Sequence, residues 1–379
     1  MKKEELVLLS LIRKSQFETT ESIDFNDVDM NALYNEAVIQ AVIGLVSAEI
    51  PADHLDKSWN DAHLQQIASY VRYCNAEKGL KNVLSNENIP FVILKGNAAA
   101  MNYNNPSLRK MGDIDFLVPQ SMFSKTKSLL TNSGYVEDHG YERHIAYRKD
   151  GILFELHHHY SDDLDIEDYL IEGLNNYETA NIVGHEFPIL PKLANGLVLL
   201  DHMRRHLKSG LGLRQVIDWM MFVYKNLDDR YWENEFHSAA LSKGMDILAT
   251  TATRMCQLYL GLPETITWCK SADDSTCEEL LNCLLISGNF GRKNGKGNSV
   301  ETVSTNMKRK GLFRWLQHAG EFNWNAYHKH HWLKPFCWFY QIFRYAKQGI
   351  KTGRNKKQIK NDIDRSKERF KLLKKMGIE

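Results

Sequence analysis

Two aspartates, Asp113 and Asp115, are separated by one residue where an apolar run, residues 114–118, begins. Successive side chains of a strand point to opposite faces, so both carboxylates are expected on one face, about 7 Å apart. Such a pair can hold divalent cations for a phosphoryl displacement, and hard oxygen ligands favour Mg²⁺, or Mn²⁺. If the pair stood alone, solvation or capping at a strand end would be the preferred explanation. However, acids that lead directly into a buried strand need a neutralising partner.

A second polar face is expected on the run 152–159, where Glu155 and His157 alternate with apolar residues. Glu155 can then share the sheet face of the aspartates, and it could complete a metal site or accept a proton from an attacking hydroxyl. A half-exposed edge strand would show the same alternation. Consecutive histidines of a strand point to opposite faces, so the run 157–159 favours one substrate contact by His157 rather than a zinc site.

A glycine turn, Lys95-Gly96, follows the apolar run 90–94 and precedes a helical stretch that opens with Asn97. Glycine at a strand-to-helix turn brings backbone N–H groups close to a phosphate, and Lys95 could add a positive charge. A turn glycine beside a surface lysine is the alternative.

The elements that must position these residues are expected to form an α+β fold, with a small mixed sheet between N-terminal and C-terminal helical regions. Helical spacing fills residues 4–86, and the pattern turns helical again beyond 164 apart from a strand at 185–190. The sheet unit has strands at 90–94, 114–118, 144–148 and 152–159, with a helix at 121–132 and a hairpin turn at Asp150-Gly151. Further helices are expected at 193–208, 213–226, 231–243, 245–260 and 277–288. The expected domains are an N-terminal helical region, an α/β core, a helical domain, and a basic loop with C-terminal helices, at residues 1–88, 89–192, 193–290 and 291–379.

The charges divide unevenly along the 379 residues. Residues 291–379 hold 22 Lys+Arg against 6 Asp+Glu, whereas the first 290 residues carry a net charge of −15. The glycine-rich stretch 291–298 is expected to be a mobile loop, because it has too few apolar side chains to pack. We find neither a signal peptide nor a run long enough to span a bilayer, and expect a cytoplasmic protein, which could be peripheral to the membrane.

An aromatic segment, residues 335–345, precedes a series of lysines and arginines. Aromatic and basic residues together could bind an anionic membrane surface or nucleic acid. The alternative is ordinary packing, because Trp338, Phe339, Ile342 and Phe343 have the spacing of a core-facing helix, and the bases could pair with the acidic remainder of the chain.

These motifs together resemble the family of uncharacterised nucleotidyltransferases, a branch of the polymerase β-like superfamily, over roughly residues 5–225. The resemblance implies that the small mixed sheet is of nucleotidyltransferase type and that residues 89–192 are the nucleotidyltransferase core. The resemblance implies that Asp113, Asp115 and Glu155 bind the metal, and that the Lys95-Gly96 turn replaces the Gly-Ser phosphate turn of most of the superfamily. It also implies that Arg109 contacts the triphosphate or orients Asp113. The further nucleotide-binding candidates in these motifs are Asn97, Gly112 and His157.

Two residue pairs beyond the sheet also match the family. His202 and His206 share one helix face, as do Arg214 and Asp218, and each pair could hold the acceptor or the base beside the site. An Arg214–Asp218 ion pair that only positions helices is the alternative.

The function expected is transfer of a nucleoside monophosphate from ATP or another NTP to a hydroxyl-bearing acceptor, with Mg²⁺. The acceptor could be a small molecule, a protein or RNA. One alternative is a non-catalytic nucleotide-binding scaffold in a membrane-surface or polysaccharide-biosynthesis assembly. Another is a toxin–antitoxin-like modifier of protein or RNA.

Overall fold

The N-terminal helices arise from apolar residues at helical spacing, and aspartate side chains begin two of them. In the computed structural model these helices are α1 (Lys3–Phe17), α2 (Met30–Ile39), α3 (Ile43–Ser47) and α4 (Lys57–Asn86). Asp29 and Asp56 accept hydrogen bonds from the first backbone N–H groups of α2 and α4. The structure describes the whole chain except residues 18, 20–21, 141–143, 162–165, 183, 209, 295–310, 353–355 and 379.

A seven-stranded mixed sheet follows, in the order β3-β4-β5-β2-β1-β7-β6. Its strands are β1 (Val92–Leu94), β2 (Ile114–Leu117), β3 (Val136–Gly140), β4 (His144–Lys149), β5 (Ile152–His157), β6 (Glu178–Ile182) and β7 (His185–Ile189). The central strand β2 is antiparallel to β1 and parallel to β5. The expected α+β class with a mixed sheet is confirmed.

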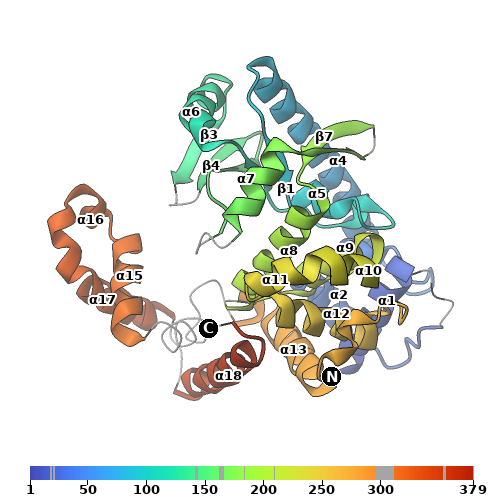
Figure 1. Ribbon diagram of the computed structural model, residues 1–379. Helices are drawn as coiled ribbons and strands as arrows, with labels where there is room; N and C mark the ends of the chain where they lie inside the picture. Colours follow the sequence, from blue (N-terminus) through green and yellow to red (C-terminus); the bar gives the residue numbers. More distant parts are fainter. Residues whose placement is uncertain are drawn as a thin grey trace.

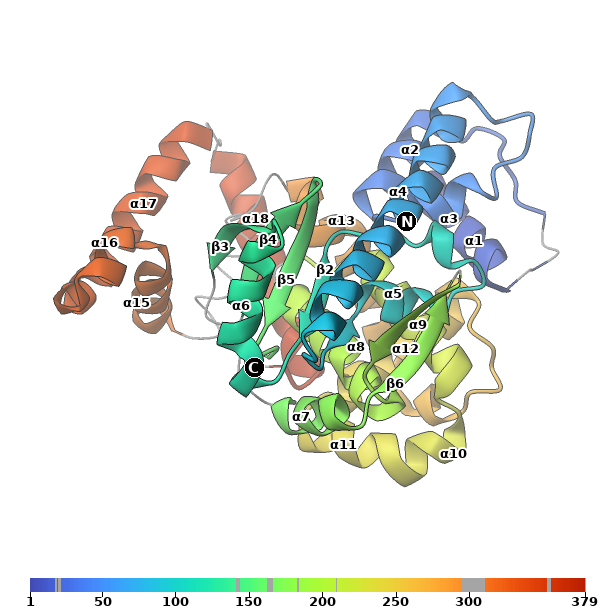
Figure 2. The ribbon, with the colours of Figure 1, turned by 90° about the horizontal axis from the view of Figure 1, so that it is seen from above.

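Alternation along the strands gives the sheet two chemically different faces. Ile114 and Phe116 of β2, like Phe154 and Leu156 of β5, pack in a buried apolar cluster with α4 and α6 (Phe123–Asn132). Figure 2 shows α4 and α6 lying over the strands. The residues between them, on the other face, are the polar ones.

The helical part, most of which is drawn below the sheet in Figure 1, forms a second, larger core. It contains α7 (Glu167–Asn175), α8 (Lys192–Leu207), α9 (Leu213–Asn226), α10 (Asp229–Tyr231), the π-helical η3 (Trp232–Phe236), α11 (His237–Ser242), α12 (Asp246–Leu260), α13 (Asp274–Ser287) and the C-terminal α18 (Lys356–Lys375). Helices α1 to α3 belong to the same core. Within the residues described here, no helix has both the length and the apolarity that crossing a membrane requires.

A helical hairpin stands apart from the rest of the described chain in both views (Figures 1 and 2). It consists of α15 (Leu312–Asn323), α16 (Asn325–Lys329), η6 (His331–Phe336) and α17 (Cys337–Thr352). Gly320 permits the close approach of α15 and α17, because a Cβ there would lie 1.9 Å from the carbonyl oxygen of Cys337. The rings of Trp315 and Tyr345 stack at 5.4 Å across this contact.

The structure differs from the sequence expectations in three places. Two edge strands, β3 and β6, were not predicted, because edge strands carry polar residues and show weak alternation. The stretch 291–294 lies in the 3₁₀ turn η5 (Asn289–Asn294) rather than in a mobile loop, and Gly291 is buried against Gly210; residues 295–298 lie outside the described residues. The packing interpretation of the aromatic segment is wrong for Phe339 and Phe343, which are 58% and 70% exposed.

Candidate active site

Three carboxylates meet on the polar face of the sheet, where β2 and β5 run side by side. Asp115 lies directly opposite Glu155 in the register, and Asp113 precedes β2 by one residue. One oxygen from each of Asp113, Asp115 and Glu155 lies within 4.8 Å of the others. The period of two in both strands therefore produces the shared face expected from the sequence.

Asp115 is buried and is neutralised by two cations. Lys95 Nζ lies 2.8 Å from its Oδ1, and His157 Nε2 donates a hydrogen bond to the same atom at 2.9 Å. His157 Nδ1 lies 3.2 Å from the carbonyl oxygen of His159, so each ring nitrogen faces an acceptor and the imidazolium form is favoured. Burial alone would raise the pKa of Asp115, but Lys95 and His157 overcome it and lower the pKa well below its ordinary value. The contacts leave Oδ2 as the oxygen that can face a cation.

Asp113 and Glu155 add negative charge that the surrounding residues balance less completely. Burial first, and then the Asp115 carboxylate, raise the pKa of Asp113 to about 6. A neighbouring negative charge opposes the ionisation of a carboxyl, and a bound divalent cation favours it. The three carboxylates therefore fit a metal of the Mg²⁺ class. His144 contacts Glu155 at 3.6 Å, and His144, Glu155 and His157 form a second group of possible ligands that overlaps the first.

The turn at Lys95-Gly96 brings the lysine to the carboxylates. Lys95 has φ of 50°, in the left-handed region, and Gly96 continues the turn with φ of 38°. Burial would lower the pKa of Lys95, but the Asp115 carboxylate raises it, so the ammonium form is held in place. The helix after the turn, α5 (Gly96–Ala100), has only five residues, so its dipole is small.

Asn97 lies beneath this turn and not in the cleft. Its side-chain amide is buried and donates a hydrogen bond of 2.7 Å to Glu77 of α4. Burial raises the pKa of Glu77 to about 7. Asn97 therefore supports the turn from below instead of contacting a nucleotide as expected.

Helices α8 and α9 form the opposite wall of a cleft of about 370 Å³. His202 and His206 of α8 lie with their ring centroids 4.5 Å apart, and both line the cleft. Burial lowers the pKa of both rings, that of His206 to about 3, so both are neutral at pH 7. Phe290 closes the cleft beside His206, at 4.8 Å between centroids.

Arg214 supplies positive charge to this wall from α9. Its Nη1 donates to the carbonyl oxygen of Lys110 at 3.1 Å, while its buried Nε has no hydrogen-bond partner among the described residues. An arginine held in this way, with buried donor capacity, suits an anionic ligand. Gly112 lies beside it, and a Cβ there would lie 3.6 Å from Arg214 Nη1.

A buried ion pair joins the two walls of the cleft. Arg109, which precedes β2, donates from Nε and Nη2 to the two carboxylate oxygens of Asp218 on α9, at 2.7 and 2.8 Å. Tyr103 donates a third hydrogen bond to Asp218 at 2.7 Å. The partner of Asp218 is thus Arg109 rather than Arg214, and Asp218 does not line the cleft. Arg109 lines it, but its guanidinium is fixed by Asp218 and not by Asp113.

The cleft therefore contains every predicted site residue except Asn97 and Asp218. It also contains three residues that were not predicted: His144, Arg205 and Phe290. His144 pairs with His157 across the β4–β5 hairpin, a register that the turn at Asp150-Gly151 fixes. Arg205 stacks over the Tyr160 ring at 4.4 Å and shares a helix face with His202. Both could have been inferred from spacing.

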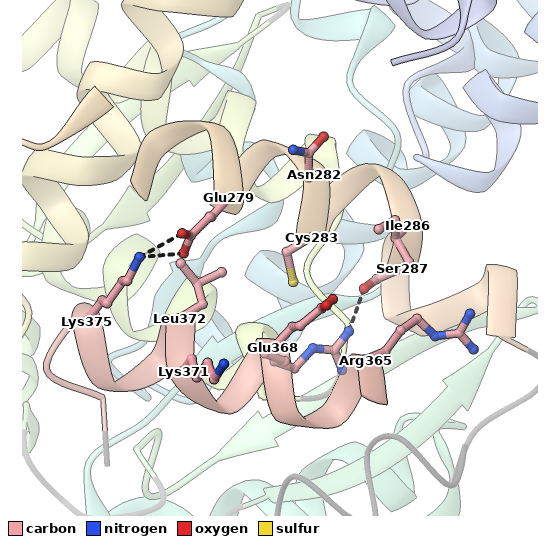
Figure 3. A pocket seen from close by; sticks show the side chains of 11 residues that line it. Glu279, Asn282, Cys283, Ile286, Ser287, Arg365, Glu368, Lys371, Leu372 and Lys375 are labelled. Carbon is pink, nitrogen blue, oxygen red and sulfur yellow. Dashed lines mark hydrogen bonds and ion pairs between the residues drawn. The ribbon is translucent and has the colours of Figure 1, made fainter. Parts of the chain in front are cut away.

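A second and larger cavity, about 620 Å³, lies between α13 and α18 (Figure 3). Polar side chains of the two helices contact each other across this cavity. Lys375 forms an ion pair with Glu279 at 2.7 Å, and Arg369 donates a hydrogen bond to Ser287. None of the predicted site residues lines it. This cavity is the interface along which the C-terminal helix packs on α13, not a second cluster of carboxylates.

Two solved structures resemble this one weakly. The solution structure of the antibiotic-resistance factor ANT(2'')-Ia matches 52% of this chain and 95% of its own, at 12% identity and a TM-score of 0.32. The crystal structure of an antigenic nucleotidyltransferase-like protein from Paracoccidioides brasiliensis matches 51% and 95%, at 14% identity and a TM-score of 0.35. No curated protein matches the chain.

The family comparison covers the sheet and most of the cleft. Residues 26–261 match a family described as "Uncharacterised nucleotidyltransferase". This stretch contains the carboxylates, the Lys95-Gly96 turn and the wall from α8 and α9, and it omits Phe290 and the helical hairpin. Since the match spans more than half of the 379 residues, the chain belongs to the uncharacterised nucleotidyltransferase family, as its motifs indicated.

Proposed function

We propose that the cleft transfers a nucleoside monophosphate from an NTP to a hydroxyl group of an acceptor. The observation that carries this proposal is the convergence of Asp113, Asp115 and Glu155 within 4.8 Å, opposite a wall that bears Arg214 and Arg205. Carboxylates for a cation and guanidinium groups for phosphate are the two requirements of phosphoryl chemistry.

The metal would be held by Asp113, Asp115 through Oδ2, and Glu155. When bound, Mg²⁺ or Mn²⁺ supplies positive charge for the attacking and leaving oxygens. Lys95 and His157 keep Asp115 ionised and fix its orientation, because both bind its Oδ1. Mn²⁺ is the expected substitute, because carboxylate oxygens suit it as they suit Mg²⁺.

The phosphates would lie between the carboxylates and α9, where Arg214 lines the cleft. The acceptor oxygen attacks the α-phosphorus, a new P–O bond forms, and the bond to the bridging oxygen breaks to release pyrophosphate. Glu155 would take the acceptor's proton. His202 and His206 are neutral and can accept or donate a hydrogen bond to the acceptor or the base.

The test is release of pyrophosphate by the full chain from each NTP with Mg²⁺ or Mn²⁺, over a panel of hydroxyl acceptors. Asp113→Asn and Asp115→Asn should each reduce the rate by about a thousandfold or more, because catalysis of this kind rests on charge at the metal site. Glu172→Gln, at an exposed acid on α7, is the matched control and should leave the rate unchanged.

Binding separates loss of catalysis from loss of fold. A non-hydrolysable NTP should bind the wild type only with the metal, and Asp115→Asn should abolish the metal-dependent part. If the NTP releases pyrophosphate at the same rate with an active acceptor in the wild type and in both asparagine variants, the proposal is wrong.

A further inference from the structure

The helical hairpin carries an apolar surface that nothing in the described chain covers. The aromatic face, as we name it, consists of Trp332, Phe336, Phe339, Ile342 and Phe343, which are between 43% and 72% exposed. Large apolar side chains exposed together, rather than singly, mark interaction surfaces. From this face we propose that η6 and α17 bind an anionic lipid surface, with the helix axis lying in the plane of the interface.

The spacing of the aromatic face makes it one side of a helix. Phe336, Phe339 and Phe343 recur at intervals of three and four residues. The opposite side of α17 is already used, because Cys337 and Gln341 are buried and Cys337 lies against α15. The outward residues therefore do not pack against α15, and they remain exposed although the hairpin is fully formed.

The charges of the hairpin fit an anionic partner. Residues 311–352 hold six Lys+Arg and a single acid, Glu321, which lies 3.9 Å from Lys334. Arg314, Lys329 and Lys347 are exposed. An amphipathic helix with aromatic residues on one face and bases beside them is the arrangement that inserts shallowly into anionic bilayers.

The same features disfavour other occupants. A second copy docked through the same face would bring two positively charged hairpins together, and like charges across an interface oppose association. A nucleic acid would stack on aromatic rings, yet Ile342 offers no ring and lies among the phenylalanines. A protein surface that binds anionic lipid needs only apolar side chains with positive charges beside them.

The experiment is co-sedimentation of the full chain with vesicles of phosphatidylcholine, with and without phosphatidylserine. We expect binding only when phosphatidylserine is present, and weaker binding as salt is raised. Phe339→Ser and Phe343→Ser should each weaken partitioning about tenfold, because each removes an inserted ring. Arg314→Gln and Lys347→Gln should each weaken it about fivefold.

Leu64→Ser is the matched control, since Leu64 on α4 is 64% exposed and lies outside the hairpin. It should bind vesicles as the wild type does, and circular dichroism should show all variants folded. Equal sedimentation of the wild type and the Phe339→Ser/Phe343→Ser variant would overturn the proposal. Two other results would also overturn it if the wild type does not bind vesicles. One is a dimer in light scattering that the double substitution abolishes, and the other is binding of a single-stranded oligonucleotide that the double substitution abolishes.

Discussion

The cleft and the aromatic face both depart from the usual arrangement of polar side chains outside and apolar side chains inside. The cleft buries polar side chains, and the aromatic face exposes apolar ones. In the cleft, Asp115, Arg214 and His202 are charged or polar and are each less than one-tenth exposed, whereas on the aromatic face Phe343 and Trp332 are large and apolar and are more than two-thirds exposed. Burying polar groups and exposing apolar groups both oppose folding. Under the two proposals, each surface would oppose folding for the sake of a ligand, a nucleotide in the cleft and an anionic lipid surface at the aromatic face.

The two regions are also assembled differently. The cleft draws on the Lys95-Gly96 turn, β2, β4, β5, α8, α9 and η5, which are spread along the sequence, and its geometry depends on how the sheet and the helices pack. The aromatic face comes from one continuous run of residues on η6 and α17. Substitutions in the cleft should therefore affect folding as well as binding, and substitutions on the aromatic face should affect binding alone.

The largest effect is expected at the buried pair of Arg109 and Asp218. Arg109→Met or Asp218→Asn leaves the other charge buried without its partner, and each should lower the free energy of unfolding by about 3 to 5 kcal/mol. The double variant Arg109→Met/Asp218→Leu should recover most of this loss. Urea unfolding followed by tryptophan fluorescence measures all three. Single variants as stable as the wild type would show that the pair does not hold the cleft together.

Glu77, below the Lys95-Gly96 turn, should give a pH-dependent effect. Burial raises its pKa from 4.5 to about 7 in the folded protein. The protonated form therefore favours the folded state, and this stability is complete below pH 4.5 and lost as the pH rises through about 7. Glu77→Gln does not titrate, so its stability relative to the wild type should rise by about 3 kcal/mol across that window. Glu172→Gln should show no such trend in the same urea series.

Arg214 tests where the phosphates bind within the cleft. Arg214→Met removes the guanidinium that faces the proposed phosphates, and the affinity for a non-hydrolysable NTP should fall by about ten to a hundredfold. Titration calorimetry with Mg²⁺ present measures it. Arg148→Gln, at an arginine whose side chain is 55% exposed, is the matched control and should bind as the wild type does. Unchanged affinity in Arg214→Met would place the phosphates elsewhere.

The raised pKa of Asp113 predicts how metal affinity follows pH. A proton competes with the metal below the pKa of about 6, so the affinity for Mn²⁺ should fall about tenfold per pH unit below pH 6 and change little above it. Asp113→Asn should bind Mn²⁺ more weakly and lose the part of this dependence that Asp113 causes. A steep fall that persists unchanged in the variant would assign the proton to another group.

The smallest effect on folding is expected on the aromatic face. Phe339→Ser or Phe343→Ser should change the free energy of unfolding by less than about 0.5 kcal/mol, because both rings are exposed. Phe222→Ala, at a ring that is 1% exposed, should cost about 3 to 5 kcal/mol. A large loss in Phe343→Ser would mean that the ring packs against the protein, and the comparison between the two regions would fail.

The part of this structure that the sequence predicts is the part governed by local periodicity. Alternation placed Asp115 and Glu155 on one sheet face, and helical spacing placed His202 beside His206, all of which line one cleft. The pairing of Arg109 with Asp218 could not be read in this way, because the two residues are 109 positions apart and meet only when the sheet packs on α9.

Other differences have local causes. Phe290 has φ of 57° in a glycine-rich turn that reads as a loop, and only the approach of Gly291 to Gly210 brings it over the cleft. On α17 the helical spacing of apolar residues was read correctly as a face, but spacing does not state whether a face points inward. That information comes from Cys337 and Gln341, which occupy the inward side.

The ion pair between Arg109 and Asp218 has a mechanical consequence. It ties the loop before β2 to α9 with two short hydrogen bonds, and Tyr103 anchors the same carboxylate from a third direction. The sheet and the helical wall therefore cannot swing apart without exposing a buried charge. A molecule entering the cleft must fit a gap whose width is set before it arrives, so selection among acceptors would rest on their size and shape more than on closure around them.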